Sequence, residues 1–244
     1  MLTTHGLVTV RTTSSRLPRK CLLPFGSGNV LEHVIRRAKH YGITPIVCTS
    51  VDPADDEIEA ISKVEGVQWF RGSLVNKLKR WSDCAKHFGL RDFHTVDADD
   101  PFFDGAEMIR SLSYMRKHDF DMVTPTSASS AGAASVGYSL TADIVARASA
   151  GLDDAADTEM MWYLLEKVPG IRFQELPELG EPLRVRLTLD YPEDYWLLES
   201  VRRMVGNLAS REEIDSLFRS NPDLYKINWF RNQEWKASQE AKRI

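Results

Sequence analysis

A basic, hydroxyl-rich segment directly follows the first apolar run of the chain, residues 6–10. Residues 11–20 hold four basic side chains, four hydroxyl groups and no carboxylate. A loop of this composition at the carboxyl end of a strand in an open α/β sheet lies where such folds bind ligands. Cations, hydroxyls and backbone N–H groups neutralise a polyphosphate and donate hydrogen bonds to its oxygens. The segment indicates a nucleoside triphosphate site, and a solvated basic turn is the alternative.

A second chemical feature is the carboxylate cluster Asp97, Asp99 and Asp100, which ends an apolar strand pattern just before Pro101. Crowded like charges repel one another, and a divalent cation is their usual partner. Mg²⁺ prefers oxygen ligands of this kind. The cluster therefore indicates a metal site, with a simple turn before the proline as the alternative.

A third feature lies far along the chain, around Asp190. Alternating apolar residues over 184–189 predict a strand, and Pro192 with the acids after it predicts the first turn of a helix. Helix capping accounts for Glu193 and Asp194. Asp190 stands between the two elements, and we expect it at the same sheet edge as Asp99 if both strands are parallel.

The elements that position these residues alternate along the chain. Apolar patterns predict strands over 6–10, 45–48, 67–70, 93–97 and 121–124, and helices over 29–40, 55–64 and 74–88, the last with Ser73 as N-cap. The second half predicts strands over 135–140, 172–176 and 184–189, helices over 142–150 and 157–167, and a flexible loop over 127–135. This order predicts a three-layer α/β/α domain with a mostly parallel sheet.

Composition limits the partners. The chain has 244 residues and a formal net charge of −4, which argues against a general nucleic-acid-binding surface. Its three cysteines lack metal-ligand spacing and cannot all pair, as expected in a reducing cytoplasm. We also expect no membrane anchor and no signal peptide, because no apolar run approaches the length of either.

The pattern R-x-x-S-x-R-L-P-x-K over residues 11–20 resembles the N-terminal signature of the cytidylyltransferases that make CMP-activated sugars. The spore-coat polysaccharide branch is the most similar, and the 3-deoxy-manno-octulosonate and acylneuraminate cytidylyltransferases are more distant. The resemblance implies that phosphates are bound by Arg11, Ser14, Arg16 and Lys20. Thr13 and Arg19 stand where that branch usually has glycine.

Further segments extend this resemblance over nearly the whole chain, including the tail around Asn221–Asn228. Residues 98–101 are similar to the family's G-D-x-P stretch and residues 186–194 to its R-L-T-V-D-T-P-E-D motif, which implies Mg²⁺ bound by Asp99 and Asp190. Residues 48–56 and 70–80 resemble loops that surround cytosine and ribose, which implies nucleotide contacts from Thr49, Ser50, Arg71, Ser73 and Arg80. Glu159 matches a glutamate on the acceptor side.

The resemblance implies a nucleotide-diphospho-sugar transferase-like fold and a Mg²⁺-dependent enzyme that transfers CMP from CTP to an anionic sugar or sugar acid for surface polysaccharide or glycoconjugate synthesis. Arg11, Arg16 and Lys20 would neutralise the departing pyrophosphate. Residues 1–244 would form one domain and a homodimer, with 125–183 as the acceptor-binding and dimerisation excursion and 207–244 as a helical extension. The alternatives are a glycosyltransferase using Asp97-Ala98-Asp99, and a non-catalytic nucleotide-sugar-binding protein.

Overall fold

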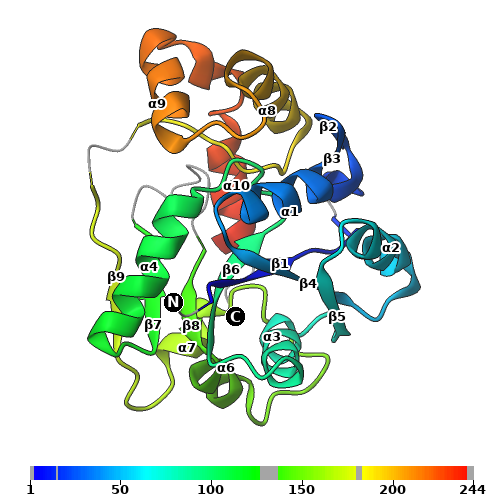
Figure 1. Ribbon diagram of the computed structural model, residues 1–244, viewed down its shortest axis with the longest axis vertical. Helices are drawn as coiled ribbons and strands as arrows, with labels where there is room; N and C mark the ends of the chain where they lie inside the picture. Colours follow the sequence, from blue (N-terminus) through cyan, green and yellow to red (C-terminus); the bar gives the residue numbers. More distant parts are fainter. Residues whose placement is uncertain (1–2, 15, 127–136, 180–182, 241–244) are drawn as a thin grey trace.

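The computed structural model describes residues 3–14, 16–126, 137–179 and 183–240 (Figure 1). Its main sheet contains seven strands in the order β5-β4-β1-β6-β8-β7-β9. These strands are β1 (His5–Thr9), β4 (Thr44–Ser50), β5 (Gln68–Gly72), β6 (Asp92–Asp97), β7 (Met122–Thr124), β8 (Ser139–Thr141) and β9 (Phe173–Glu175). Only β8 runs antiparallel to its neighbours, so the predicted mostly parallel sheet is confirmed.

Helices cover both faces of this sheet. Adjacent strand residues point to opposite faces, and Leu7 and Val8 accordingly belong to different cores. Leu7 packs with side chains of α3, α6 and α7, and Val8 packs with those of α1, α2 and α4. The helices are α1 (Val30–His40), α2 (Asp56–Val64), α3 (Lys77–His87), α4 (Gly105–His118), α6 (Ala142–Ser149) and α7 (Trp162–Glu166). The three-layer α/β/α class is therefore confirmed.

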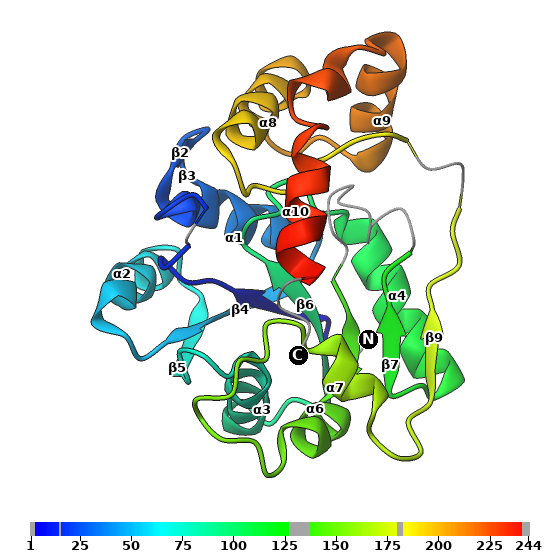
Figure 2. The same ribbon diagram turned by 180° about the vertical axis from the view of Figure 1, so that it is seen from behind.

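The remaining helices belong to the C-terminal part of the chain. Helices α8 (Pro192–Val205) and α9 (Arg211–Ser220) form a lobe at the top of Figures 1 and 2, and α10 (Arg231–Glu240) leads from this lobe back toward the sheet. Short elements complete the fold: η1 (Lys20–Leu22), β2 (Pro24–Phe25), β3 (Gly28–Asn29), η2 (Pro53–Asp55) and η3 (Leu224–Ile227). No helix within the described ranges is long and apolar enough to cross a membrane.

Strand order places the ligand crevice. The chain runs outward from β1 through β4 to β5 and then returns to the other side of β1 as β6. The carboxyl ends of β1 and β6 therefore lie at the point where the strand order reverses, which is where open α/β sheets bind ligands. The basic loop follows β1 and the carboxylate cluster follows β6. Both chemical features are thus brought to the same crevice.

Four predicted elements are wrong or shorter than expected. Residues 184–189 form no strand. Helix α3 begins at Lys77, because the Asn76 side chain, rather than Ser73, accepts the N-cap hydrogen bond from Lys79 N. The helix predicted over 157–167 is reduced to α7, and the strand predicted over 135–140 to β8. Residue 15 and the predicted flexible loop over 127–135 lie outside the described residues.

Candidate active site

A buried carboxylate anchors the start of the basic loop. The Thr12 backbone N–H and hydroxyl both donate to Asp55 Oδ1 at 2.8 Å, and the Ser50 hydroxyl donates to Asp55 Oδ2 at 2.5 Å. Burial alone would raise the pKa of Asp55, but the hydrogen bonds from Ser50 and Thr12 outweigh it and hold that pKa below its ordinary value. The loop is therefore fixed to the carboxyl end of β4 at its first turn.

Arg19 has a left-handed backbone, with φ 57° and ψ 26°, at a position where the resembling family usually has glycine. A side chain in this conformation costs free energy that glycine does not. The Arg19 side chain points outward and pairs with Glu57 on the surface, with more than half of each side chain exposed. The backbone conformation, rather than the charge, explains the family's preference at this position.

We expect Arg19→Gly to have a higher free energy of unfolding than Arg19→Ala, by about 1 kcal/mol. Both variants lose the surface ion pair with Glu57, so the comparison isolates the backbone. Urea unfolding of the two variants measures the difference. An alanine variant as stable as the glycine variant would show that the left-handed conformation carries no cost.

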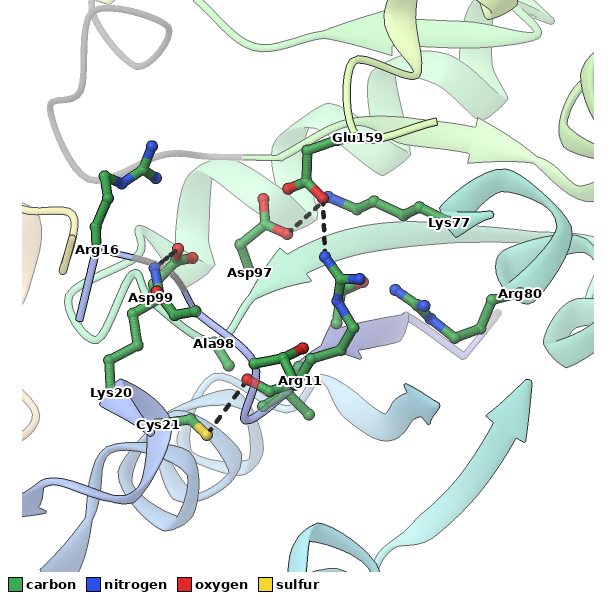
Figure 3. A pocket seen from close by; sticks show the side chains of 14 residues that line it. Arg11, Arg16, Lys20, Cys21, Lys77, Arg80, Asp97, Ala98, Asp99 and Glu159 are labelled. Carbon is green, nitrogen blue, oxygen red and sulfur yellow. Dashed lines mark hydrogen bonds and ion pairs between the residues drawn. The ribbon is translucent and has the colours of Figure 1, made fainter. Parts of the chain in front are cut away.

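The loop closes over a cavity of about 180 Å³ at the carboxyl ends of β1 and β6 (Figure 3). Charged side chains dominate its wall: Arg11, Arg16, Lys20, Lys77, Arg80, Asp97, Asp99 and Glu159. Ser14 and Thr13 add hydroxyl groups. Of the site residues expected from the sequence, this pocket brings together Arg11, Ser14, Arg16, Lys20, Arg80, Asp99 and Glu159.

Lys20 stands between the two expected metal ligands. Its ammonium group lies 2.5 Å from Asp99 Oδ2 and 2.9 Å from Asp190 Oδ1, and Arg16 Nη2 lies 2.7 Å from the same Asp190 oxygen. Burial alone would lower the pKa of Lys20, but the charges of Asp99 and Asp190 outweigh it and raise that pKa. Burial alone would likewise raise the pKa of Asp190, but Lys20 and Arg16 hold it well below its ordinary value. Lys20 and Asp190 are therefore both held in their charged forms.

Asp99 and Asp190 lie close together, but not because two parallel strands end at the same sheet edge, as the sequence predicts. Residues 184–189 are not a sheet strand, and a single backbone hydrogen bond, from Leu189 N to Asp99 O at 2.7 Å, joins the two segments. The apolar side chains of this segment pack instead with α8 and α9, as Leu187 and Leu189 show. The alternation separates the apolar side chains, which pack against these helices, from Arg186 and Thr188, which are also buried, and it does not mark a place in the sheet.

A second charged group lines the other part of the pocket, and the sequence interpretation missed half of it. Lys77 Nζ lies 3.3 Å from Asp97 Oδ1, and Arg11 Nη2 lies 3.0 Å from Glu159 Oε2. Burial alone would lower the pKa of Lys77, but Asp97 and Glu159 raise it. Lys77 precedes Trp81 by one helical turn, on the apolar face of α3. A charge on that face was the available sequence signal.

Four of the expected nucleotide-binding residues do not line the pocket. Thr49 and Ser50 are fully buried, and Arg71 donates to the carbonyl oxygens of Ser50, at 2.9 Å, and Asp52, at 2.8 Å. The Ser73 hydroxyl donates to Asp154 O at 3.1 Å. Arg80 does line the pocket, and its Nη1 donates to Ser73 O at 2.6 Å. These residues support the wall, and their contact with a nucleotide stays a prediction.

The residues present suit a cation that is shared with a substrate. Within the described ranges no three His, Cys, Asp or Glu side chains gather as a metal-binding group. Asp99 and Asp190 nevertheless converge on one positive charge, the Lys20 ammonium. Mg²⁺ is usually held by one or two carboxylates together with substrate phosphates and water. The two carboxylates fit this arrangement, with phosphate oxygens as the missing ligands.

Comparisons with known proteins show which proteins this chain is similar to. The spore coat polysaccharide biosynthesis protein SpsF of Bacillus subtilis is 25% identical over 229 residues, which cover 89% of this chain and 94% of that protein. A cytidylyltransferase from Leptospira borgpetersenii has the same fold, with a TM-score of 0.79 and 23% identity over 92% of this chain and 97% of that one.

A second solved structure shares the fold at lower similarity. CMP:2-keto-3-deoxy-manno-octonic acid synthetase, solved as a complex with CTP, aligns with a TM-score of 0.62 and 17% identity over 83% of this chain and 99% of that one. The sequence model of the cytidylyltransferase family matches residues 5–153, which include the basic loop, Asp99 and every residue that lines the pocket except Glu159. This match covers more than half of the chain, which therefore belongs to the cytidylyltransferase family of nucleotidyltransferases.

Proposed function

We propose that this enzyme transfers CMP from CTP to an anionic sugar or sugar acid, with Mg²⁺ as cofactor and pyrophosphate as the second product. One observation carries the proposal: the basic loop and Asp99 line one pocket, and Lys20 of that loop pairs with both carboxylates, Asp99 and Asp190. Binding of a triphosphate requires the cations and hydroxyls of the basic loop, and binding of a phosphate-bound cation requires the two carboxylates. An enzyme that consumes a finished nucleotide sugar has no need of a triphosphate arm.

The reaction follows from these groups. An acceptor oxygen attacks the α-phosphorus of CTP in line, a new O–P bond forms, and the bond to the β-phosphate oxygen breaks with its electrons leaving on pyrophosphate. The acceptor hydroxyl loses its proton. Such transfers require positioning and charge stabilisation. Arg11, Arg16 and Lys20 neutralise the β- and γ-phosphates, and the Ser14 hydroxyl donates to them. Mg²⁺, held by Asp99 and Asp190 when bound, supplies charge neutralisation at the phosphate oxygens.

The remaining assignments divide the pocket between base and acceptor. We assign the cytosine and ribose to Thr49, Ser50, Arg71, Ser73 and Arg80, of which Arg80 lines the pocket and donates to Ser73 O. The acceptor lies on the side of Glu159, whose ion pair with Arg11 keeps it next to the phosphates. Residues 125–183 bind the acceptor and form the contact of a cytoplasmic homodimer, and the similarity to SpsF supports a product used in surface polysaccharide synthesis.

The Asp97-Ala98-Asp99 pattern does not favour glycosyl transfer. Asp97 pairs with Lys77 in one part of the pocket, whereas Asp99 pairs with Lys20 in another (Figure 3). The two carboxylates have different partners and do not act as one metal-binding pair in this arrangement. This separation supports nucleotidyl transfer, in which Asp99 works with the distant Asp190.

We expect CTP to be used in preference to UTP, ATP and GTP. Pyrophosphate release is measured with each nucleotide, Mg²⁺ and a panel of sugar acids and sugar phosphates as acceptors. The Asp190→Asn variant, prepared in the same way, corrects for contaminating phosphatases. Equal turnover with UTP or GTP would contradict the cytidylyl assignment and leave nucleotidyl transfer standing.

A further inference from the structure

A buried network holds the turn that carries Asp190. The Arg186 guanidinium is fully buried and donates to both oxygens of Asp194, at 2.9 and 3.0 Å, and to Asp190 Oδ2 at 3.3 Å. Asp194 Oδ2 also accepts the backbone N–H groups of Asp190, at 2.9 Å, and Tyr191, at 3.0 Å. Asp194 thus caps α8, as the sequence predicts, and in addition ties the turn to Arg186.

The other half of this network comes from the C-terminal segment. Asn228 Nδ2 donates to Arg186 O and to Asp194 Oδ1, both at 2.9 Å. Asn232 Oδ1 accepts from Arg186 Nη1 at 3.1 Å. Asn228 is completely buried and Asn232 is 6% exposed, although they lie more than 30 residues beyond the turn that they contact. The segment leading into α10 therefore packs its amide groups around Arg186.

The same segment also holds the outer side of the turn. Arg231 forms a two-point ion pair with Glu193, at 2.9 and 3.0 Å, and its guanidinium lies over the Tyr191 ring, 4.8 Å from the centroid. Arg16, from the basic loop, lies 5.8 Å from the centroid of that ring. Tyr191 thus connects the phosphate loop to the C-terminal segment through the turn at Asp190.

The two carboxylate oxygens of Asp190 contact different partners. Oδ1 faces Lys20 and Arg16 at the pocket, and Oδ2 faces Arg186. The contact with Arg186 therefore fixes the rotation of the carboxylate. A buried guanidinium is held in one place only when its N–H groups have partners, since an unpaired buried donor is costly. The orientation of Asp190 Oδ1 depends in this way on the partners of Arg186.

We propose that Asn228 and Asn232 are positioning residues for the metal carboxylate: they hold Arg186 and Asp194 in the geometry that directs Asp190 Oδ1 toward Lys20 and Arg16. The C-terminal segment that contains Asn228 and Asn232 then positions an active-site residue and is not only a helical extension. This inference rests on the proposed function, because it takes Asp190 to be a metal ligand. Groups that orient metal ligands typically affect metal affinity about 10- to 100-fold.

The test measures Mn²⁺ binding by paramagnetic resonance of the free ion, with CTP present and no acceptor, together with the melting temperature. We expect Asn228→Ala and Asn232→Ala to bind Mn²⁺ about 10-fold more weakly than the wild type. Asn232→Asp keeps an oxygen that accepts from Arg186 and should restore most of the affinity. Asn221→Ala is the matched control: the side chain of this exposed asparagine donates only to Leu217 O, at 2.9 Å, among the described side-chain contacts.

A lower melting temperature with unchanged Mn²⁺ affinity in both alanine variants would overturn the proposal and leave a structural role. If Asn228→Ala does not fold, the comparison of Asn232→Ala with Asn232→Asp decides, because Asn232 lies at the edge of the network. Asp190→Asn distinguishes a wrong metal assignment from a wrong positioning role. If it binds Mn²⁺ like the wild type, the metal assignment fails and this proposal fails with it. If it binds weakly while the asparagine variants bind normally, only the positioning role is wrong.

Discussion

Asp190→Asn and Asp99→Asn are each expected to reduce the rate of CMP transfer on the order of 10²-fold or more, as when one preorganised charge is removed from a reaction centre. The substitution keeps the size of the side chain but removes a charge that faces Lys20 and, at Asp190, also Arg16 and Arg186. Pyrophosphate release at saturating CTP and acceptor measures the loss.

The two variants should differ in stability. Asp190 is almost fully buried, and its pKa is held below the ordinary value, so its ionised form stabilises the fold at neutral pH. Asp190→Asn should therefore melt at a lower temperature than Asp99→Asn, whose side chain is 27% exposed. Asp143→Asn removes a charge from a carboxylate that is 70% exposed on α6 and serves as control. Full activity in both site variants with limiting Mg²⁺ would place the metal elsewhere.

Lys20→Ala should weaken CTP binding by about 10- to 100-fold, the range expected for a lost hydrogen bond between charged groups. The penalty for CMP should be small, because only CTP carries the β- and γ-phosphates. Lys20→Arg should restore part of the affinity, since a guanidinium is larger and directs its donors differently. Calorimetric titration of CTP and of CMP into each variant, without metal, measures both penalties.

The matched control for Lys20 is its neighbour Arg19. That side chain is 57% exposed and pairs only with Glu57 among the described contacts, so its charge is worth little. Arg19→Ala should bind CTP nearly as well as the wild type. If Lys20→Ala loses the same affinity for CTP and for CMP, Lys20 does not contact the β- and γ-phosphates. Residues 11–20 are then better interpreted as a basic surface turn.

The sequence by itself determined the layers of the fold and most of the pocket wall. Short apolar runs and the helices between them follow from local patterning, and the strands β1, β4, β5 and β6 therefore appear where they were predicted. In a parallel sheet these strands end at the same edge. Residues that follow them, such as Arg11, Lys20 and Asp99, consequently meet in one pocket without further information.

Tertiary structure alone decided how the distant parts meet. Residues 184–189 alternate like a strand, but their apolar side chains pack against α8 and α9, because a local pattern does not specify which element the side chains contact. The pairing of Lys77 with Asp97, and of Arg186 with Asn228 and Asn232, joins segments that no local pattern relates. Buried polar groups must find partners wherever the fold supplies them. The orientation of Asp190 is thus fixed by side chains that only the folded chain brings near it.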